Sequence, residues 1–169
     1  MLTNKPAVDG LLKLLGEVIS VYQELFSLLR RENKILRDIS LDELLENNKK
    51  IETQILKVRI LEESISKIFA RVSDELSLPS KDLTLLKLST FTKEPYSNKF
   101  INFHSRLAQL AEDIEALRQE NEIFIKRSLN YIENSFSFLN SLINSDLTYI
   151  QEGTKKKSSN FKNLISQKV

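Results

Sequence analysis

LLKLLGEVISVYQELFSLLRRENKILRDI, residues 11–39, is the stretch that decides the fold. Its apolar residues recur at alternating intervals of four and three along the chain. The row they form is Leu11, Leu15, Val18, Tyr22, Leu25, Leu29 and, after one polar position, Leu36. Alternation of four and three is the heptad pattern of helices that pack as coiled coils. One long helix is therefore expected over residues 8–38.

The same spacing predicts two further long helices, over residues 41–76 and 101–144. Ser40 and Glu43 have the spacing of a capping box at the start of the second helix, and Ile39 and Leu44 have that of a hydrophobic staple. So short a corner favours an antiparallel hairpin of the first two helices, with one bent continuous helix as the alternative. Pro79 ends the second helix because it lacks the amide donor that a helix interior needs.

The stretch between the second and third long helices is the least regular part of the chain. A short helix is expected over residues 82–88, and the polar run 92–98 around Pro95 is typical of a loop. Near the other end, Gly153 is a natural stop for a helix. The sequence predicts an all-α protein, an antiparallel bundle of long coiled-coil-like helices, over residues 1–153. A flexible, basic, amphipathic C-terminal arm is expected over residues 154–169.

Composition narrows the class of protein. The chain has 169 residues and a net charge of +2, but the last sixteen residues hold five lysines and no acidic residue, which leaves the rest acidic. It has no cysteine, which excludes disulfides and thiolate metal sites and is compatible with a reducing cytosol. No apolar run approaches the roughly 18–20 residues of a membrane span, and the first residues lack the features of a signal peptide. A soluble, cytoplasmic protein is expected.

Residues that could carry chemistry are scarce. His104 is the one histidine, and a lone histidine on a helix is far more often a packing or surface residue than a base or ligand. The two closest glycines, Gly10 and Gly16, do not form a phosphate-binding loop. Acidic pairs such as Glu62-Glu63 are typical of solvated helix faces. We predict no enzymatic activity, no catalytic or metal-binding residue and no cofactor.

Three polar residues interrupt otherwise apolar heptad rows: Asn48, Glu62 and Asn121. A buried polar residue penalises misaligned helix pairs, so these residues are expected to specify the register of the bundle. Contact with a partner protein is the alternative.

Residues 128–151 carry two apolar rows and only two charges, Glu133 and Asp146. Such a segment either fills the centre of the bundle or offers a partly exposed groove to a helix of another protein. The tail adds an apolar set that would share one face if it became helical on binding. The candidate substrate-binding residues are Phe136, Leu139 and Ile143 in the helix, and Phe161, Leu164 and Ile165 in the tail. The lysine run at 155–157 lacks interleaved aromatic or arginine residues, so specific nucleic-acid binding is not expected.

Several features occur in a definite order along the chain. They are the leucine-rich first helix with Leu28-Leu29-Arg30-Arg31-Glu32, Asp38 before the capped Leu41-Asp42-Glu43-Leu44, the stretch Asn48-Lys49-Lys50-Ile51-Glu52, then Arg59, Asn121, and an ending with Tyr149 and Gly153. In this order they resemble the FlgN family of bacterial flagellar export chaperones, over nearly the whole chain.

The resemblance implies a cytosolic chaperone of flagellar type III secretion. Such a protein binds hook-associated proteins, which join hook and filament, prevents their premature assembly and delivers them to the export apparatus. It also implies that the C-terminal region binds substrate and that Tyr149, followed by Gly153, docks on the export gate. The tail departs from the family because it is short and rich in lysine. A monomer or weak homodimer is expected.

Two other functions remain open from the sequence. A structural, self-assembling coiled-coil protein would bury both apolar rows of residues 128–151 between copies. A basic-tailed protein that binds nucleic acid or a membrane surface would lose affinity steeply as salt rises.

Overall fold

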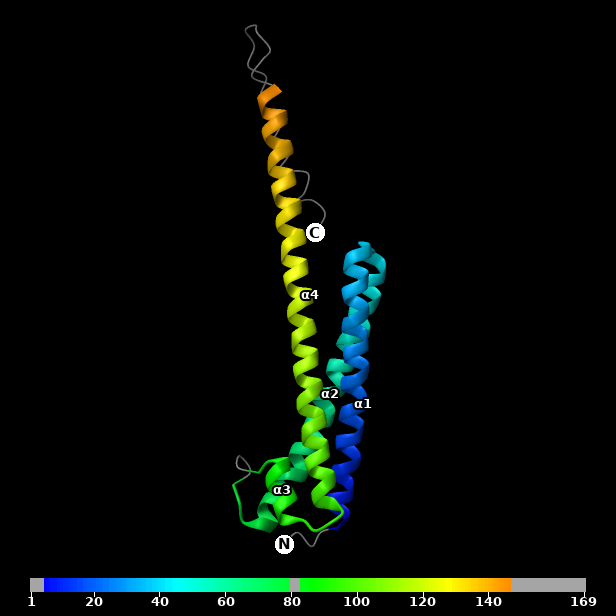
Figure 1. The fold of residues 1–169 in the computed structure, drawn as a ribbon, viewed down its shortest axis with the longest axis vertical. Helices are drawn as coiled ribbons and strands as arrows, with labels where there is room; N and C mark the ends of the chain where they lie inside the picture. The colour runs from blue at the N-terminus through cyan, green and yellow to red at the C-terminus, as the bar shows by residue number, and fades with distance from the viewer. Residues whose placement is uncertain (1–4, 80–82, 147–169) are drawn as a thin grey trace. The chain divides into compact units, whose positions relative to one another are not determined.

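The computed structural model describes residues 5–79 and 83–146. Within these ranges 92% of the residues are helical and no strand occurs, which confirms the predicted all-α bundle. The helices are α1 (Lys5–Asp38), α2 (Leu41–Leu76), α3 (Leu85–Phe91) and α4 (Tyr96–Asp146) (Figure 1). None of the described helices has a segment long and apolar enough to cross a membrane.

The chain divides into two compact units at residue 127, inside α4. The first unit, residues 1–127, contains α1, α2, α3 and the first part of α4. The second unit begins at Ser128, and its described part is the remainder of α4. The boundary predicted after Gly153 lies outside the described residues and stays a prediction.

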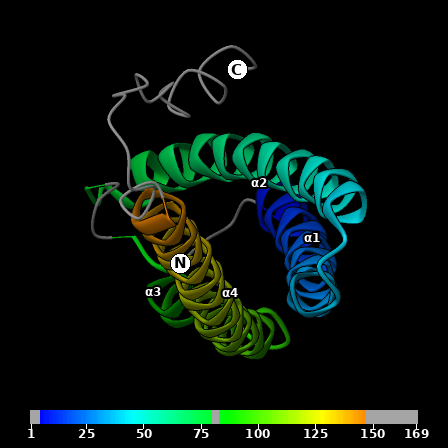
Figure 2. The same ribbon diagram turned by 90° about the horizontal axis from the view of Figure 1, so that it is seen from above.

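In the first unit α1 and α2 form the predicted antiparallel hairpin and lie side by side in both views (Figures 1 and 2). The heptad row of α1 explains the packing, because Leu11, Leu15 and Val18 are all buried. Each such side chain contributes about 1.5–3 kcal/mol when it is fully buried. The alternative of one bent continuous helix is therefore wrong.

The corner between α1 and α2 differs from its prediction. Ser40 is the N-cap residue of α2, but its side chain makes no capping hydrogen bond, so the capping box with Glu43 is absent. The staple is also absent, because Ile39 is 90% exposed and has a left-handed backbone with φ of 54°. The left-handed conformation of Ile39 lets the chain change direction in the two residues between α1 and α2. The Ile39 side chain then points into solvent and does not pack on Leu44. The backbone carbonyl of Ser40 instead accepts the first helical bond, from the Leu44 amide at 3.1 Å.

The end of α2 agrees with its prediction. Ser77 adopts the left-handed conformation after Leu76 and donates its amide to the Asp74 carbonyl, while Leu78 donates to the Ser73 carbonyl. This pair of bonds is a Schellman motif, which satisfies helix-end carbonyls.

The short helix α3 and the start of α4 are displaced from their predicted positions. α3 starts three residues later than predicted, because Thr84 caps it by accepting the Lys87 amide at 3.1 Å. α4 starts at Tyr96, directly after Pro95, so residues 96–98 are helical and not loop. Proline suits a helix start, where its missing donor costs nothing. α4 is still helical at Asp146, the last described residue of this range, two residues beyond the predicted 144.

All four helices contribute to the main core of the first unit. Its most deeply buried members are Leu11 of α1, Val72 of α2, Leu88 of α3 and Phe100 of α4. Figure 1 shows α3 near the first turns of α4, and Leu88 and Phe100 lie in the same core. This core fixes the first part of α4 against the hairpin.

Candidate functional site

Asn121 of α4 is buried against α1 and has a partner for each side-chain group. It is 2% exposed, and its amide donates to the Leu29 carbonyl at 3.0 Å and to the Glu32 carboxylate at 2.7 Å. Its carbonyl accepts from the Asn33 amide at 2.7 Å. A polar group buried with complete hydrogen bonding tolerates no sliding of α4 along α1. The geometry suits the register role predicted for Asn121.

The two other residues predicted to specify the register, Asn48 and Glu62, are not buried as Asn121 is. Asn48 is half-buried, and its neighbour Asn47 is the buried one, 1% exposed. The Asn47 amide donates to the Leu28 carbonyl at 3.0 Å. Two consecutive carbonyls of α1, those of Leu28 and Leu29, thus each accept an asparagine amide, one from α2 and one from α4. Sequence reasoning missed Asn47 because it counted the heptad row of α2 one residue too late at this point.

Glu62 is exposed and lies at the rim of a cleft where α1, α2 and the first part of α4 meet. The cleft has a volume of about 310 Å³, with walls formed by Tyr22, Leu25, Ile55, Val58, Ala111 and Ile114 and charges from Arg59, Glu62 and Glu115. Burial, and then the nearby charge of Glu62, raise the pKa of the Tyr22 phenol, which stays neutral at physiological pH. The cleft therefore offers an apolar surface with a charged rim.

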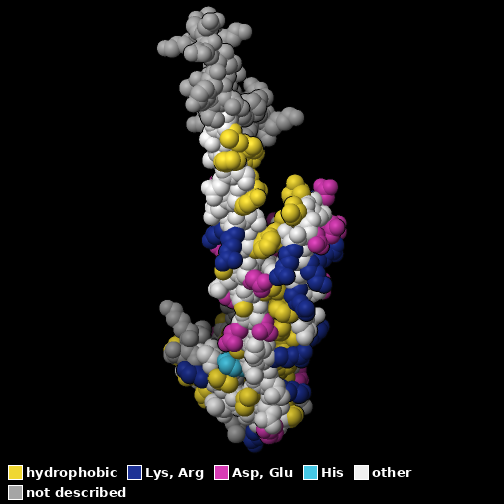
Figure 3. Space-filling view, turned by 45° about the horizontal axis from the view of Figure 1, so that its top comes forward, with side chains coloured by type: hydrophobic (Ala, Val, Ile, Leu, Met, Phe, Trp, Pro, Cys, Tyr) yellow, Lys and Arg dark blue, Asp and Glu magenta, His cyan; other side chains and the backbone are white. Residues whose placement is uncertain are grey.

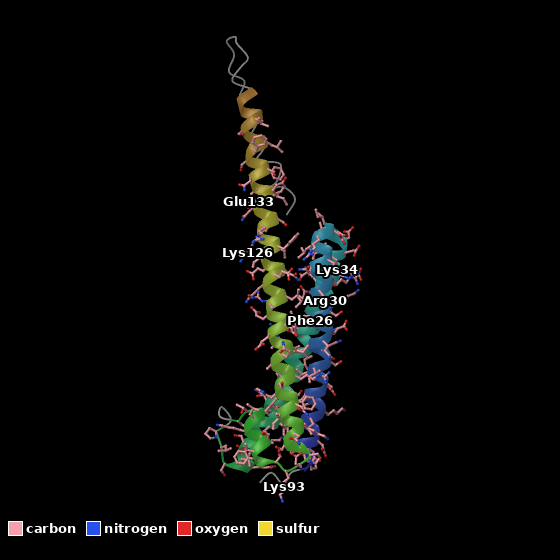
Figure 4. The ribbon with its side chains drawn as sticks, in the orientation of Figure 1. Phe26, Arg30, Lys34, Lys93, Lys126 and Glu133 are labelled. Atoms are coloured by element: carbon pink, nitrogen blue, oxygen red, sulfur yellow. The ribbon has the colours of Figure 1, made fainter. Side chains whose placement is uncertain are left out.

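Four charged side chains of α4 form ion pairs with one another within the helix. Arg118 bonds the Glu115 carboxylate at 2.8 Å and the Glu122 carboxylate at 2.9 Å, and Lys126 bonds Glu122 at 2.5 Å. On α1, Arg30 stacks over the Phe26 ring at 6.0 Å (Figure 4). Among residues 5–79 and 83–146, no three His, Asp or Glu side chains gather closely enough to hold a metal ion. His104 is exposed.

The second unit carries a set of exposed apolar side chains on α4, which we call the apolar arc. Its members are Leu129, Tyr131, Ile132, Phe136, Phe138, Leu139 and Leu142, between 46% and 75% exposed. Hydrophobic side chains gather on the last described turns of α4 in Figure 3. Exposed apolar surface of this extent marks a site of interaction with another molecule. The exposure of these side chains does not fit the alternative that residues 129–142 fill the centre of the bundle.

The candidate substrate-binding residues fall partly on the apolar arc. Phe136 is 57% and Leu139 is 52% exposed, and both are free to contact a partner. Glu133 is the one charged side chain among residues 128–142 (Figure 4). The side chain of Ile143 and the residues Tyr149, Gly153, Phe161, Leu164 and Ile165 lie outside the described residues, so their roles stay predictions.

Comparison with known proteins identifies the family. A model of the FlgN protein family matches residues 1–157, and so covers all of the described helices. Neither the curated proteins nor the solved structures give a match. The resemblance predicted from the sequence is therefore confirmed over most of the chain, and the chain belongs to the FlgN family of flagellar export chaperones.

Proposed function

We propose that this protein is a cytosolic chaperone that binds hook-associated flagellar proteins before export and delivers them to the flagellar type III export apparatus. The observation that carries the proposal, beyond membership of the family, is the exposed apolar arc of α4. A chaperone needs such a surface, because the partner segments that it must keep from assembling are themselves apolar.

The binding mechanism follows from the chemistry of the arc and the tail. Phe136, Leu139 and Ile143 contact the apolar side of the substrate, and the tail then closes over it with Phe161, Leu164 and Ile165. Ordering the tail costs roughly 1–2 kcal/mol for each residue fixed, which offsets part of the contact energy. Affinity is therefore moderate and release is possible, as delivery requires.

The export apparatus recognises the segment that follows α4. We assign docking on an export-gate component to Tyr149, together with Gly153. This division of labour leaves the first unit as a rigid support, fixed by its core and by Asn121. The chaperone is a monomer or weak homodimer.

The exposure of the arc also favours one other function, a structural protein that assembles with copies of itself through α4. The two functions differ in what covers the arc. An obligate oligomer in the absence of substrate supports self-assembly, whereas a monomer that binds a hook-associated protein supports the chaperone.

Substitution on the arc tests the proposal. We expect Phe136→Asp with Leu139→Asp to abolish binding of purified hook-associated proteins in calorimetric titration, because two charges would be buried in an apolar contact. The melting temperature should change little, since both side chains are more than half exposed. The matched control is Asn130→Asp with Ser137→Asp on the polar side of the same turns.

The tail requires its own variant. Phe161→Asp with Leu164→Asp should weaken the same titration without altering the helicity measured by circular dichroism. Unchanged binding in both the arc and the tail variants would reject the proposed site.

A further inference from the structure

The apolar arc is too wide for a single partner helix. At about 100° per residue, Tyr131, Phe138 and Leu142 form one row and the remaining members form a second, about 120° away. Together the rows span about 180° of the helix surface. Both are exposed, from 46% at Leu142 to 75% at Tyr131 in the first row and from 49% at Ile132 to 57% at Phe136 in the second. Two packed helices share a narrower stripe, so one partner helix would leave one row in water.

The strip of α4 surface between the two rows carries small side chains, so other helices can come close to α4 there. By the same spacing Ser128 and Ser135 lie between the two rows. The Ser135 hydroxyl donates to the Tyr131 carbonyl of its own helix at 2.8 Å, so it requires no partner from another molecule. Small side chains at this position let two neighbouring helices straddle α4, one over each row.

The first unit already shows α4 in this kind of packing. Asn121 bonds α1 at the Leu29 carbonyl, and Ile114 shares the cleft with Val58 of α2. There the partner of α4 is a helical hairpin, α1–α2. Within the first unit, a hairpin of two antiparallel helices thus packs against a single helix of this chain.

A second copy of this chain fits the arc less well. Two copies that pair through α4 cover one row on each helix and leave the other exposed. A helical hairpin covers both rows at once. Glu133, the one charged residue in residues 128–142, lies on the polar side, so the surface that fits the arc is uncharged.

We infer that the apolar arc of α4 binds an antiparallel pair of apolar helices from one partner molecule, and that α4 completes an intermolecular three-helix bundle. The inference rests on the proposed function, which makes that partner a hook-associated protein. From Leu129 to Leu142 the arc is about 20 Å long, so partner helices of about fourteen residues cover it. The contact depends little on ionic strength, since the charges that salt would screen are absent from the arc.

Photo-crosslinking from the two rows tests the inference. In the full chain, p-benzoyl-phenylalanine replaces Phe138 of the first row or Phe136 of the second, and Asn134 on the polar side provides the control. Each labelled chain is irradiated with purified hook-associated proteins, and the crosslinked peptides are identified by mass spectrometry. We expect the two rows to label two different helical segments of one partner, and the control to label neither.

The outcomes separate this inference from the proposed function. A complex in which both rows label the same single segment rejects the helical pair and leaves the chaperone function standing. Crosslinks between two copies of this chain reject the helical pair and support self-assembly. If no complex forms, both the proposed function and the proposed pair of partner helices are rejected.

A titration of row variants checks the same point without a label. Tyr131→Asp with Phe138→Asp, and separately Ile132→Asp with Leu139→Asp, should each weaken binding by about ten-fold or more. A partner that uses one helix would leave one of the two variants within about two-fold of the unchanged chain.

Discussion

At the scale of single residues, two buried asparagines donate to backbone carbonyls of α1, one from α2 and one from α4, and they are not equivalent. Asn121 uses both its amide and its carbonyl in hydrogen bonds. Asn47 donates to the Leu28 carbonyl, but its own side-chain carbonyl is buried and has no partner among the described residues. A buried acceptor without a donor costs about 1–3 kcal/mol, so Asn47 retains only part of the benefit of its hydrogen bond.

We therefore predict that Asn121→Ala lowers the free energy of unfolding more than Asn47→Ala does. The loss should be about 1–3 kcal/mol for Asn121→Ala, because Glu32 and Asn33 each lose a partner. It should be about 0.5–1 kcal/mol for Asn47→Ala, because removal of the unpaired carbonyl offsets the lost bond. Urea unfolding measures both, with Asn134→Ala on the exposed surface as control. Equal losses would contradict this account of the two sites.

Tyr149 is the residue to which we assign docking on the export gate. We predict that Tyr149→Ala leaves helix content and melting temperature nearly unchanged and reduces export of hook-associated proteins in a secretion assay. Tyr149→Phe, which keeps the ring, should restore most of the export. A large loss of stability in Tyr149→Ala would make this residue part of the packing and remove it from the docking site.

Heptad spacing predicts residues well where packing alone decides their place. Leu11, Leu15 and Val18 are buried as their spacing requires. Ile39 is the opposite case, since the local staple pattern gave way to a tight turn with a left-handed residue. The choice between Asn47 and Asn48 depends on how α1 and α2 cross. That information lies in the pairing of the two helices and not in the spacing of one.

At the scale of the helix, α4 is strengthened by a ladder of charges on its exposed side. Arg118 lies between Glu115 and Glu122, three residues after one and four before the other, and Lys126 continues the ladder. The bonds from Arg118 and then Gln119 lower the pKa of Glu115 from 4.5 to about 2. Bonds from Lys126 and then Arg118 lower the pKa of Glu122.

These pKa shifts predict how stability depends on pH. A carboxylate whose pKa is lowered by folding contributes stability above its unfolded pKa and loses it as the pH falls through the folded value. For Glu115 that window runs from 4.5 down to about 2. We expect the stability of Arg118→Ala to fall less steeply across this window than that of the unchanged chain, as measured by urea unfolding at low salt.

The control for the charge ladder is Arg106→Ala, an exposed arginine earlier in α4. It should leave the pH profile unchanged. At about 1 M salt the difference between Arg118→Ala and the unchanged chain should shrink, because screening then acts over about 3 Å. Identical pH profiles at low salt would show that the ladder contributes nothing to stability.

The ends of the helices were predicted unevenly, for a physical reason. The end of α2 at Leu76 is fixed by nearby residues, since a Schellman motif and Pro79 lie within three residues of it. The starts of α3 and α4 depend on packing around Leu88 and Phe100, which lie in one core with α1. The two starts themselves are marked by local signals, the Thr84 cap and Pro95, but threonine and proline occur in loops as well as at helix starts, so the sequence does not decide between the two.

At the scale of the whole molecule, the two units differ in how they bury their apolar residues. The first unit is a helical hairpin closed by α3 and by the first part of α4, and all four helices contribute residues to its core. The second unit exposes its apolar residues on α4. The sequence predicted the two apolar rows of this segment. Spacing alone did not show whether the rows fill the bundle or bind a partner, and the exposure of the side chains in the structure favours a partner.

The most direct test of the chaperone account is a pull-down with purified hook-associated proteins of the same organism. The full chain is compared with a version that ends at Gly153, and retained proteins are identified by mass spectrometry. We predict that the full chain retains a hook-associated protein and that the truncated chain loses most of it. If neither version retains one and the chain recovers only copies of itself, the chaperone account is wrong and a self-assembling coiled coil takes its place.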